Sequence, residues 1–259
     1  MANKRENYTG NENSILYAET GGCCPLCTQP IIFQKKGSKK PTKCYEIAHI
    51  YPLNPTQAQV TALVGHPAPP EINALENLIA LCPTCHTKYD KDFKIEELQK
   101  LRKIKERYLS DTQAKLTASQ HIIQEEVFEI LDAIASYEFD EAALSVAKFD
   151  ISTVDKKLKT GMSPLQKSEI KVNAINYYVR IRDHIRALER EDQASIRILL
   201  NQINSYYLAM SKQNPENKDL VFNYVAQWIS EKSQKPILPA KVLASFFVQN
   251  CEVFDVGTE

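Results

Sequence analysis

Two pairs of cysteines with the spacing of metal-binding knuckles frame one segment of the chain. Both pairs have the sequence Cys-x-x-Cys: Cys24 with Cys27, and Cys82 with Cys85. Such a knuckle presents two sulfur atoms on one tight turn, and four thiolates in a tetrahedron form a closed, structural zinc site. We therefore predict one structural Zn²⁺ ion. Cys23 leaves an alternative open, because Cys23 could pair with Cys27, although the spacing in the second knuckle favours Cys24.

Side chains that can activate water or hold a divalent cation lie among these cysteines. His49 and Asn77 lie between the two knuckles, and His86 directly follows the second. Asp90 comes four residues after His86, so the two side chains would share one face of a helix that begins near Pro83. Two ligands on one helical face can hold a single metal ion. A histidine with an ordinary pKa of about 6.5 can also serve as a general base near neutral pH.

Short apolar runs predict the strands that must position these residues. Residues 29–34, 43–50 and 78–81 are bounded by turn-forming residues and have the composition of short strands. A proline at the first position of a helix is favourable, so we expect a helix to begin at Pro83. This order would place His49 at the end of a strand and His86 in the first turn of a helix.

The rest of the chain has the pattern of amphipathic helices. Apolar residues such as Leu98 and Leu101 recur at helical spacing from residue 93 onward. Ser110 and Asp111 are good capping residues, and we expect one helix to end and another to begin there. Further helices are predicted at 114–138, 140–148, 164–189, 192–212, 216–232 and 239–249.

The chemistry-bearing residues resemble the HNH endonuclease family, which has the ββα-metal fold. In that family a histidine lies on the first strand, an asparagine precedes a second histidine by nine positions, and another ligand follows four positions later. The corresponding residues here are His49, Asn77, His86 and Asp90. The two knuckles match the zinc-stapled branch of the family, which has four cysteine ligands. The resemblance covers about residues 20–92 and implies an α+β N-terminal ββα-metal (HNH) module with a structural four-cysteine zinc site, followed by an all-α C-terminal domain.

The resemblance also implies catalytic roles. His49 would be the base that takes a proton from the attacking water, and Asn77 would hold the loop and orient that base by hydrogen bonding. His86 would bind a catalytic divalent cation, Mg²⁺ or another, with help from Asp90. Such a cation stabilises charge on the phosphate and on the leaving 3′ oxygen. The family hydrolyses DNA phosphodiester bonds and leaves 5′-phosphate and 3′-hydroxyl ends.

Two positions depart from the family pattern. Ala48 stands where many members carry a metal ligand, and Asp90 stands where the family name implies a histidine. Glu46 points to the same side of an ideal strand as Ala48 and offers a substitute ligand. These departures leave an alternative open, in which the segment is a zinc-stabilised nucleic-acid- or partner-binding module with a degenerate nuclease site.

The charge of the chain is zero overall but unevenly distributed. Residues 1–110 contain 15 basic and 11 acidic residues, and the remainder contains 17 and 21. Phosphates are bound through such local positive charge, so we predict that a lysine cluster contacts nucleic acid. A solvated loop is the alternative. The cluster comprises Lys35, Lys36, Lys39, Lys40 and Lys43.

These features divide the chain into three parts. We expect a polar N-terminal segment at 1–20, the nuclease module with its trailing helix at 21–108, and a helical interaction or regulatory domain at 109–259. Seven cysteines, an odd number with four in close pairs, favour metal binding in a reducing compartment over disulfides. No signal peptide and no apolar run of about 20 residues is seen. We therefore expect a bacterial cytoplasmic protein without a membrane segment.

The whole-chain layout resembles the HNH components of bacterial ABC three-component defence systems, with a logic similar to Septu-type nucleases. The resemblance rests on the run from Tyr45 to Asn54 and on a closing sequence from Asn250 to Phe254. It implies an effector in anti-phage defence whose C-terminal helices dock an ABC-type ATPase. A homo-oligomer is a further expectation.

Overall fold

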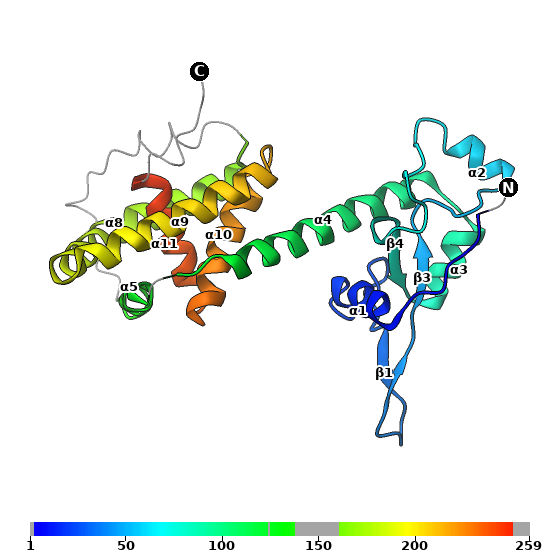
Figure 1. Ribbon diagram of the computed structural model, residues 1–259, viewed down its shortest axis with the longest axis horizontal. Helices are drawn as coiled ribbons and strands as arrows, with labels where there is room; N and C mark the ends of the chain where they lie inside the picture. The colour runs from blue at the N-terminus through cyan, green and yellow to red at the C-terminus, as the bar shows by residue number, and fades with distance from the viewer. Residues whose placement is uncertain (1–2, 124, 138–160, 251–259) are drawn as a thin grey trace. The chain divides into compact units, whose positions relative to one another are not determined.

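The computed structural model describes residues 3–123, 125–137 and 161–250 (Figure 1). The chain divides into two compact units, Met1–Gln113 and Ala114–Glu259, whereas the sequence pattern placed the division near residue 108. The helix expected at 140–148 and the closing sequence after Asn250 lie outside the described residues.

Two antiparallel strand pairs and a short helix form the centre of the N-terminal unit. Strand β1 (Ile32–Gln34) pairs with β2 (Pro41–Lys43), and β3 (Glu46–His49) pairs with β4 (Leu78–Leu81). Every residue of β4 is buried, as expected for a strand covered on both faces. Helix α3 (Pro83–Lys91) packs on β3. The result is the predicted ββα arrangement, with the strand expected at 43–50 divided into the end of β2 and β3.

The polar N-terminal segment expected at 1–20 contains a helix. Helix α1 (Gly10–Glu19) begins with a reciprocal capping box between Thr9 and Glu12, which satisfies backbone donors at the helix start. Leu16 is fully buried in the core of this unit. The remaining short elements of the unit are α2 (Gln57–Ala62) and a 3₁₀ turn η1 (Leu75–Asn77).

Helix α4 (Ile95–Gln120) runs without interruption through Ser110 and Asp111, so the predicted break there is wrong. A residue that favours a cap does not by itself end a helix, and the sequence from 95 to 120 contains no glycine or proline. Lys105 of α4 forms a buried ion pair with Glu19 of α1, with Nζ and Oε2 2.5 Å apart. This pair joins the two helices within the first unit.

The end of α4, from Ala114 onward, and five further helices form the described part of the C-terminal unit. Its core includes Trp228 and Tyr206, whose rings stack with centroids 4.5 Å apart. Among the described helices, none combines the length and the apolar character that spanning a membrane requires. The helices are α5 (Glu126–Ala135), α8 (Pro164–Glu191), α9 (Gln193–Gln213), α10 (Lys218–Ser233) and α11 (Ile237–Asn250).

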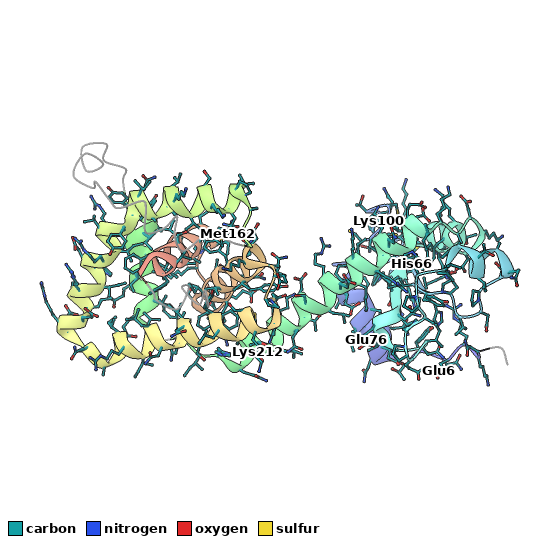
Figure 2. All side chains as sticks on the ribbon, turned by 90° about the horizontal axis from the view of Figure 1, so that it is seen from above. Glu6, His66, Glu76, Lys100, Met162 and Lys212 are labelled. Atoms are coloured by element: carbon teal, nitrogen blue, oxygen red, sulfur yellow. The ribbon has the colours of Figure 1, made fainter. Side chains whose placement is uncertain are left out.

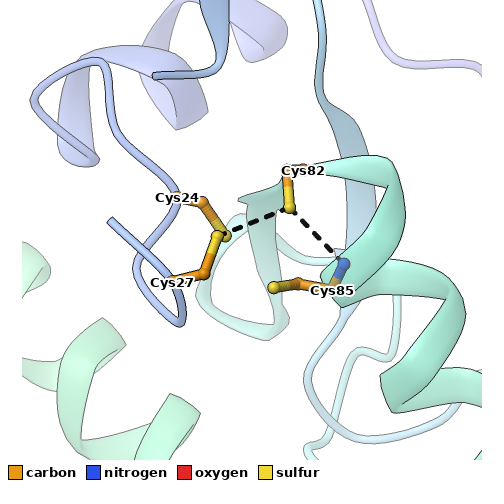
Figure 3. Close-up of side chains that lie close together, drawn as sticks. All are labelled: Cys24, Cys27, Cys82 and Cys85. Carbon is orange, nitrogen blue, oxygen red and sulfur yellow. Dashed lines mark hydrogen bonds between the residues drawn. The ribbon is translucent and has the colours of Figure 1, made fainter. Parts of the chain in front are cut away.

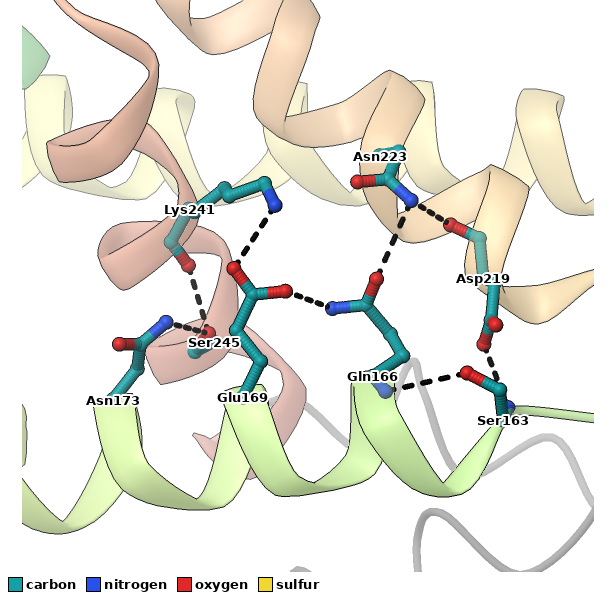
Figure 4. A network of polar contacts seen from close by, with 8 residues as sticks. All are labelled: Ser163, Gln166, Glu169, Asn173, Asp219, Asn223, Lys241 and Ser245. Carbon is teal, nitrogen blue, oxygen red and sulfur yellow. Dashed lines mark hydrogen bonds and ion pairs between the residues drawn. The ribbon is translucent and has the colours of Figure 1, made fainter.

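A polar seam joins three of these helices (Figure 4). Lys241 of α11 contacts Glu169 of α8 at 2.9 Å, and Glu169 also accepts a hydrogen bond from Gln166. The oxygen of Gln166 accepts a hydrogen bond from Asn223 of α10. Gln166 is buried and its partners are half-buried, so a shift of any one helix would break several of these bonds together. The seam therefore fixes the register of α8, α10 and α11.

Candidate catalytic and metal site

Four cysteine sulfur atoms meet at the start of α3 (Figure 3). Cys24 and Cys27 come from the loop after α1, and Cys82 and Cys85 come from the β4–α3 junction. All four sulfur atoms lie within 4.8 Å of one another, with Cys27 Sγ and Cys82 Sγ 3.7 Å apart. A Zn–S bond of about 2.3 Å implies a tetrahedral edge of roughly 3.8 Å. The donor set therefore fits the size of a zinc site.

The protein environment favours the thiolate of Cys24, whereas burial and the neighbouring sulfur atoms raise the pKa of Cys82 and Cys85. Burial by itself raises the pKa of Cys24, but backbone N–H groups of Cys82, Cys27 and Leu26 lower it to about 7. Cys82 is the N-cap of α3, where its sulfur accepts a hydrogen bond from the backbone N–H of Cys85. Cys23 lies outside the cluster, with an exposed side chain and a backbone bridge to Pro30. Of the two open alternatives, the geometry supports Cys24.

His86 lies one turn into α3, between two carboxylates. Its Nδ1 atom contacts Glu46 Oε2 of β3, and its Nε2 atom lies 3.3 Å from Asp90 Oδ2. His86 is buried, whereas the two carboxylate side chains are 53% and 61% exposed. A buried imidazole with solvent-facing carboxylates can supply the mixed nitrogen and oxygen ligands that divalent cations take. The structure thus brings together Glu46, His86 and Asp90.

Ala48 supplies no ligand and instead fills the core. Its side chain is fully buried in the core of the N-terminal unit, and the carboxylate next to His86 belongs to Glu46. Across the described ranges, the four cysteines are the one group of three or more ligand side chains whose donor atoms all lie within 4.8 Å of one another. Glu46 and Asp90 contact opposite sides of the His86 ring, so the two carboxylates are linked only through that ring. A cation at this site would therefore keep several waters, as Mg²⁺ does in proteins.

His49 ends β3 in a buried position with one hydrogen-bond partner in the described structure. Its Nε2 atom lies 3.0 Å from Asn73 Oδ1, and the Asn73 amide nitrogen donates to the backbone oxygen of Lys4. This orientation makes Nε2 the proton donor, so Nδ1 keeps a free lone pair in the neutral ring. Burial lowers the pKa of His49, and the Asn73 hydrogen bond opposes that shift. The neutral form therefore predominates at pH 7.

Asn77 holds the backbone of the loop that follows His49. Its Oδ1 atom accepts a hydrogen bond from the N–H of Tyr51 at 2.7 Å, and its Nδ2 atom donates to the oxygens of Tyr51 and Ile72. We expected Asn77 to orient His49 as well, but the side chain bonded to the imidazole is Asn73. Tyr51 and Asn77 lie 26 positions apart in the sequence, and their hydrogen bonds close the intervening loop at its base.

One cavity of about 260 Å³ connects the two histidines. Its lining includes His49 from β3, His86 and Asp90 from α3, and Arg5 from the N-terminal segment. Sequence reasoning missed Asn73 and Arg5. Neither stands at a spacing that marks a site, and Arg5 lies 44 positions before His49.

The predicted nucleic-acid contact residues lie mainly on the β1–β2 hairpin. All five lysine side chains are exposed. Lys43 differs from the others, because its Nζ atom contacts Asn13 Oδ1 at 2.7 Å and lies over the Tyr45 ring. None of the five lines the cavity. The structure therefore shows a separate basic hairpin consisting of Lys35, Lys36, Lys39 and Lys40 around its turn.

Comparison with known families yields two matches along the chain. Residues 24–92 match an HNH endonuclease domain, and residues 114–254 match C-terminal domain 11 of the ABC-three component (ABC-3C) systems. No curated protein matches the chain. The matches confirm both resemblances and the expected order of an HNH module followed by a helical domain.

Replacement of one clustered cysteine tests the zinc assignment. We expect purified Cys82→Ser to lose its zinc and the thermal stability of the N-terminal unit, because a structural zinc site contributes directly to folding. Zinc per chain, measured by elemental mass spectrometry, and thermal melting report the result. Cys23→Ser is the matched control and should retain one zinc. Equal zinc loss in both variants would contradict the assignment of Cys24.

The titration of His49 tests its local electrostatics. Because the pKa of His49 in the folded chain is lowered by burial, the ring should become protonated only below pH 6.5. Replacement of Asn73 by Leu removes the hydrogen bond that opposes this shift, so the midpoint should move to still lower pH. NMR of histidine side chains across a pH series measures both midpoints. A midpoint above 6.5, or an upward shift in Asn73→Leu, would contradict this picture.

Proposed function

This chain belongs to the family defined by C-terminal domain 11 of the ABC-three component systems, and we propose that it is the DNA-cleaving effector of such a system. Its HNH domain makes it a nuclease component. In the proposal, the chain hydrolyses DNA phosphodiester bonds with a divalent cation and acts in anti-phage defence. An ABC-type ATPase of the same system controls it.

The observation that carries the proposal is one cavity lined by two histidines with different surroundings. His49 has an amide partner and a pKa lowered by burial, so it is neutral and able to accept a proton. His86 lies against two carboxylates that favour a positive charge beside it. A base and a cation ligand in one cavity are the two parts that metal-assisted phosphodiester hydrolysis requires.

In the proposed reaction, His49 acts through its Nδ1 atom. Asn73 holds the Nε2–H group, so the ring presents the lone pair of Nδ1 and takes the proton of the attacking water there. The Asn77 side chain fixes the backbone at Tyr51, which keeps the strand end and the following loop in one conformation. The products would carry 5′-phosphate and 3′-hydroxyl ends.

We infer that His86 holds the catalytic cation with a carboxylate as further oxygen donor: Asp90 where the cation lies at Nε2, and Glu46 where it lies at Nδ1. When bound, a cation such as Mg²⁺ would stabilise negative charge on the phosphate and the leaving oxygen. Glu46 takes over the ligand role for which Ala48 has no side-chain donor. The four cysteines have a different role: their zinc would join the loop after α1 to the β4–α3 junction. Asn77 lies directly before β4, and His86 lies in the first turn of α3.

The basic hairpin supports DNA as the substrate. Lys35, Lys36, Lys39 and Lys40 are exposed around its turn, and none of them is in a salt bridge with a described residue. We propose that they contact the phosphate backbone outside the cleavage site, with Lys43 at the base of the hairpin. Contacts of this kind add affinity without sequence preference.

Replacement of the proposed base tests the enzymatic function. We expect the full chain, assayed with its ATPase partner and Mg²⁺ or Mn²⁺, to nick supercoiled plasmid, and His49→Ala to be slower by at least about 10²-fold, since general-base catalysis contributes that much. Gel separation of supercoiled and nicked plasmid measures the rate. His66 does not line the cavity, so His66→Ala is the control and should cut at the parental rate. Parental cleavage by a folded His49→Ala variant would refute the mechanism.

The helical unit supports the proposed ATPase partner. Two of its most exposed apolar side chains lie at helix starts: Leu165 in α8 is 82% exposed, and Leu238 in α11 is 71% exposed. When a partner covers such apolar side chains, they leave water and the free energy of the complex is lowered. The Glu169–Lys241 and Asn173–Ser245 contacts hold α8 and α11 in parallel register, so the two helix starts lie on the same side of the helix pair. We propose that the ATPase docks here.

Charge introduced on this surface should abolish docking without unfolding the domain. We expect Leu165→Asp combined with Leu238→Asp to lose co-purification with the ATPase of the same system while its thermal melting stays unchanged. Leu208→Asp on α9, where the native side chain is 47% exposed, is the matched control and should still co-purify. Retention of the ATPase by the double variant would place docking elsewhere.

A further inference from the structure

A short N-terminal strap, residues Asn3 to Arg5, is bonded along the rim of the catalytic cavity. The backbone N–H of Asn3 donates to Asn54 Oδ1 at 2.7 Å, and the Asn54 amide donates back to the oxygen of Asn3 at 2.8 Å. The Asn3 side chain donates to the oxygen of Leu53 at 2.9 Å. These hydrogen bonds join residues that are 51 and 50 positions apart in the sequence. The strap is therefore built into the site and is not a loose extension.

The strap shares one hydrogen-bonded chain with the proposed base. Asn73 contacts the His49 ring through its oxygen and the backbone oxygen of Lys4 through its nitrogen. The residue after Lys4 is Arg5, whose guanidinium donates to the backbone oxygen of Ile47 in β3. Arg5 is thus held at two points: the backbone oxygen of Lys4 is bonded to Asn73, and the Arg5 guanidinium is bonded to the backbone oxygen of Ile47.

Arg5 is the permanent positive charge in the cavity lining. The other ionisable lining residues are His49, His86, Tyr89 and Asp90. Within the described part of the chain, Arg5 has no carboxylate within 4.0 Å, so its charge is not neutralised by an ion pair. A guanidinium has five N–H donors in a planar fork, and such a fork matches the oxygens of a phosphate.

The cavity needs such a charge, because its acidic lining residue, Asp90, repels the substrate. Glu46, on the other side of the His86 ring, adds negative charge near a phosphodiester that is itself an anion. A cation held by these groups would offset part of this electrostatic repulsion. Arg5 lines the same cavity and offsets it as well, without a bound ion. The HNH match begins at residue 24, so Arg5 lies outside the residues that the family accounts for.

We propose that Arg5 is a substrate-binding residue that contacts a DNA phosphate in the catalytic cavity and stabilises its charge during cleavage. The strap from Asn3 to Arg5 serves to hold the guanidinium there. This inference rests on the proposed function and assigns a role to a segment outside the nuclease motif.

Binding measured without cleavage gives the first test. In buffer without added divalent cation, fluorescence anisotropy of a labelled duplex is followed over a series of salt concentrations for the full chain. We expect Arg5→Gln to bind about tenfold more weakly and to reduce the slope of log K against log salt by about one, because one phosphate contact is lost. The control is Lys100→Gln, which removes one exposed charge on α4, at the opposite edge of the N-terminal unit from Glu6 (Figure 2). It should leave the slope unchanged.

Cleavage gives the second test. With its cation and ATPase partner, Arg5→Gln should cut about 10²-fold more slowly than the parent, as expected when one donor to developing charge is removed. Arg5→Lys keeps the charge but not the fork, so it should retain the salt slope and cut at an intermediate rate. If Arg5→Gln does not fold, the cleavage rate of Arg5→Lys tests the role of Arg5 in its place. Lys100→Gln should cut at the parental rate.

The outcomes separate the two proposals. A parent chain that cuts no DNA refutes the proposed function, and the salt slopes still decide whether Arg5 contacts phosphate. A parent that cuts, with folded Arg5→Gln matching it in rate and slope, overturns the role of Arg5 alone. Equal losses in Arg5→Gln and Lys100→Gln would also overturn it, because the effect would then be one of overall charge. If Arg5→Gln fails to fold, cleavage by Arg5→Lys at the parental rate would likewise overturn the proposed role of Arg5.

Discussion

The arrangement of the N-terminal unit depends on a cluster of four cysteine sulfur atoms that come from two distant parts of the chain. Cys82 is at once a member of that cluster, the last residue before α3 and the N-cap of that helix. Since His86 follows Cys85 directly, its position is set by the same turn. Strand β4, buried along its whole length, supplies the other boundary of this junction. Geometry at the sulfur cluster is thus transmitted to the catalytic cavity over a single helical turn.

Two buried histidines in one cavity acquire different chemistry from their neighbours. The His49 ring meets a neutral amide, and burial then disfavours its charged form. Carboxylates lie on both nitrogens of His86, which favours a positive partner at that ring. Neither difference depends on the histidine itself. It arises from the strand and loop residues that fold against each ring, so the same residue type is suited to different chemistry at the two positions.

Local patterns predicted the parts of this structure that depend on local spacing. The two knuckles, the shared helical face of His86 and Asp90, and strand β4 all follow from short-range rules. The continuity of α4 did not, because a residue suited to a cap also fits inside a helix when no glycine or proline follows. Asn73 and Arg5 could not be predicted either. Their partners lie 24 and 42 residues away, and such contacts are fixed only by tertiary folding.

The closeness of the sulfur cluster to His86 has a consequence for how metal dependence is read. A general chelator such as EDTA would remove a soft-ligand zinc and a hard-ligand cation together, and the first loss would unfold the turn that carries the second site. Adding Mg²⁺ back would then restore nothing, even where Mg²⁺ is the proposed catalytic ion. Reconstitution therefore has an order: zinc first, under reducing conditions, and only then the catalytic ion.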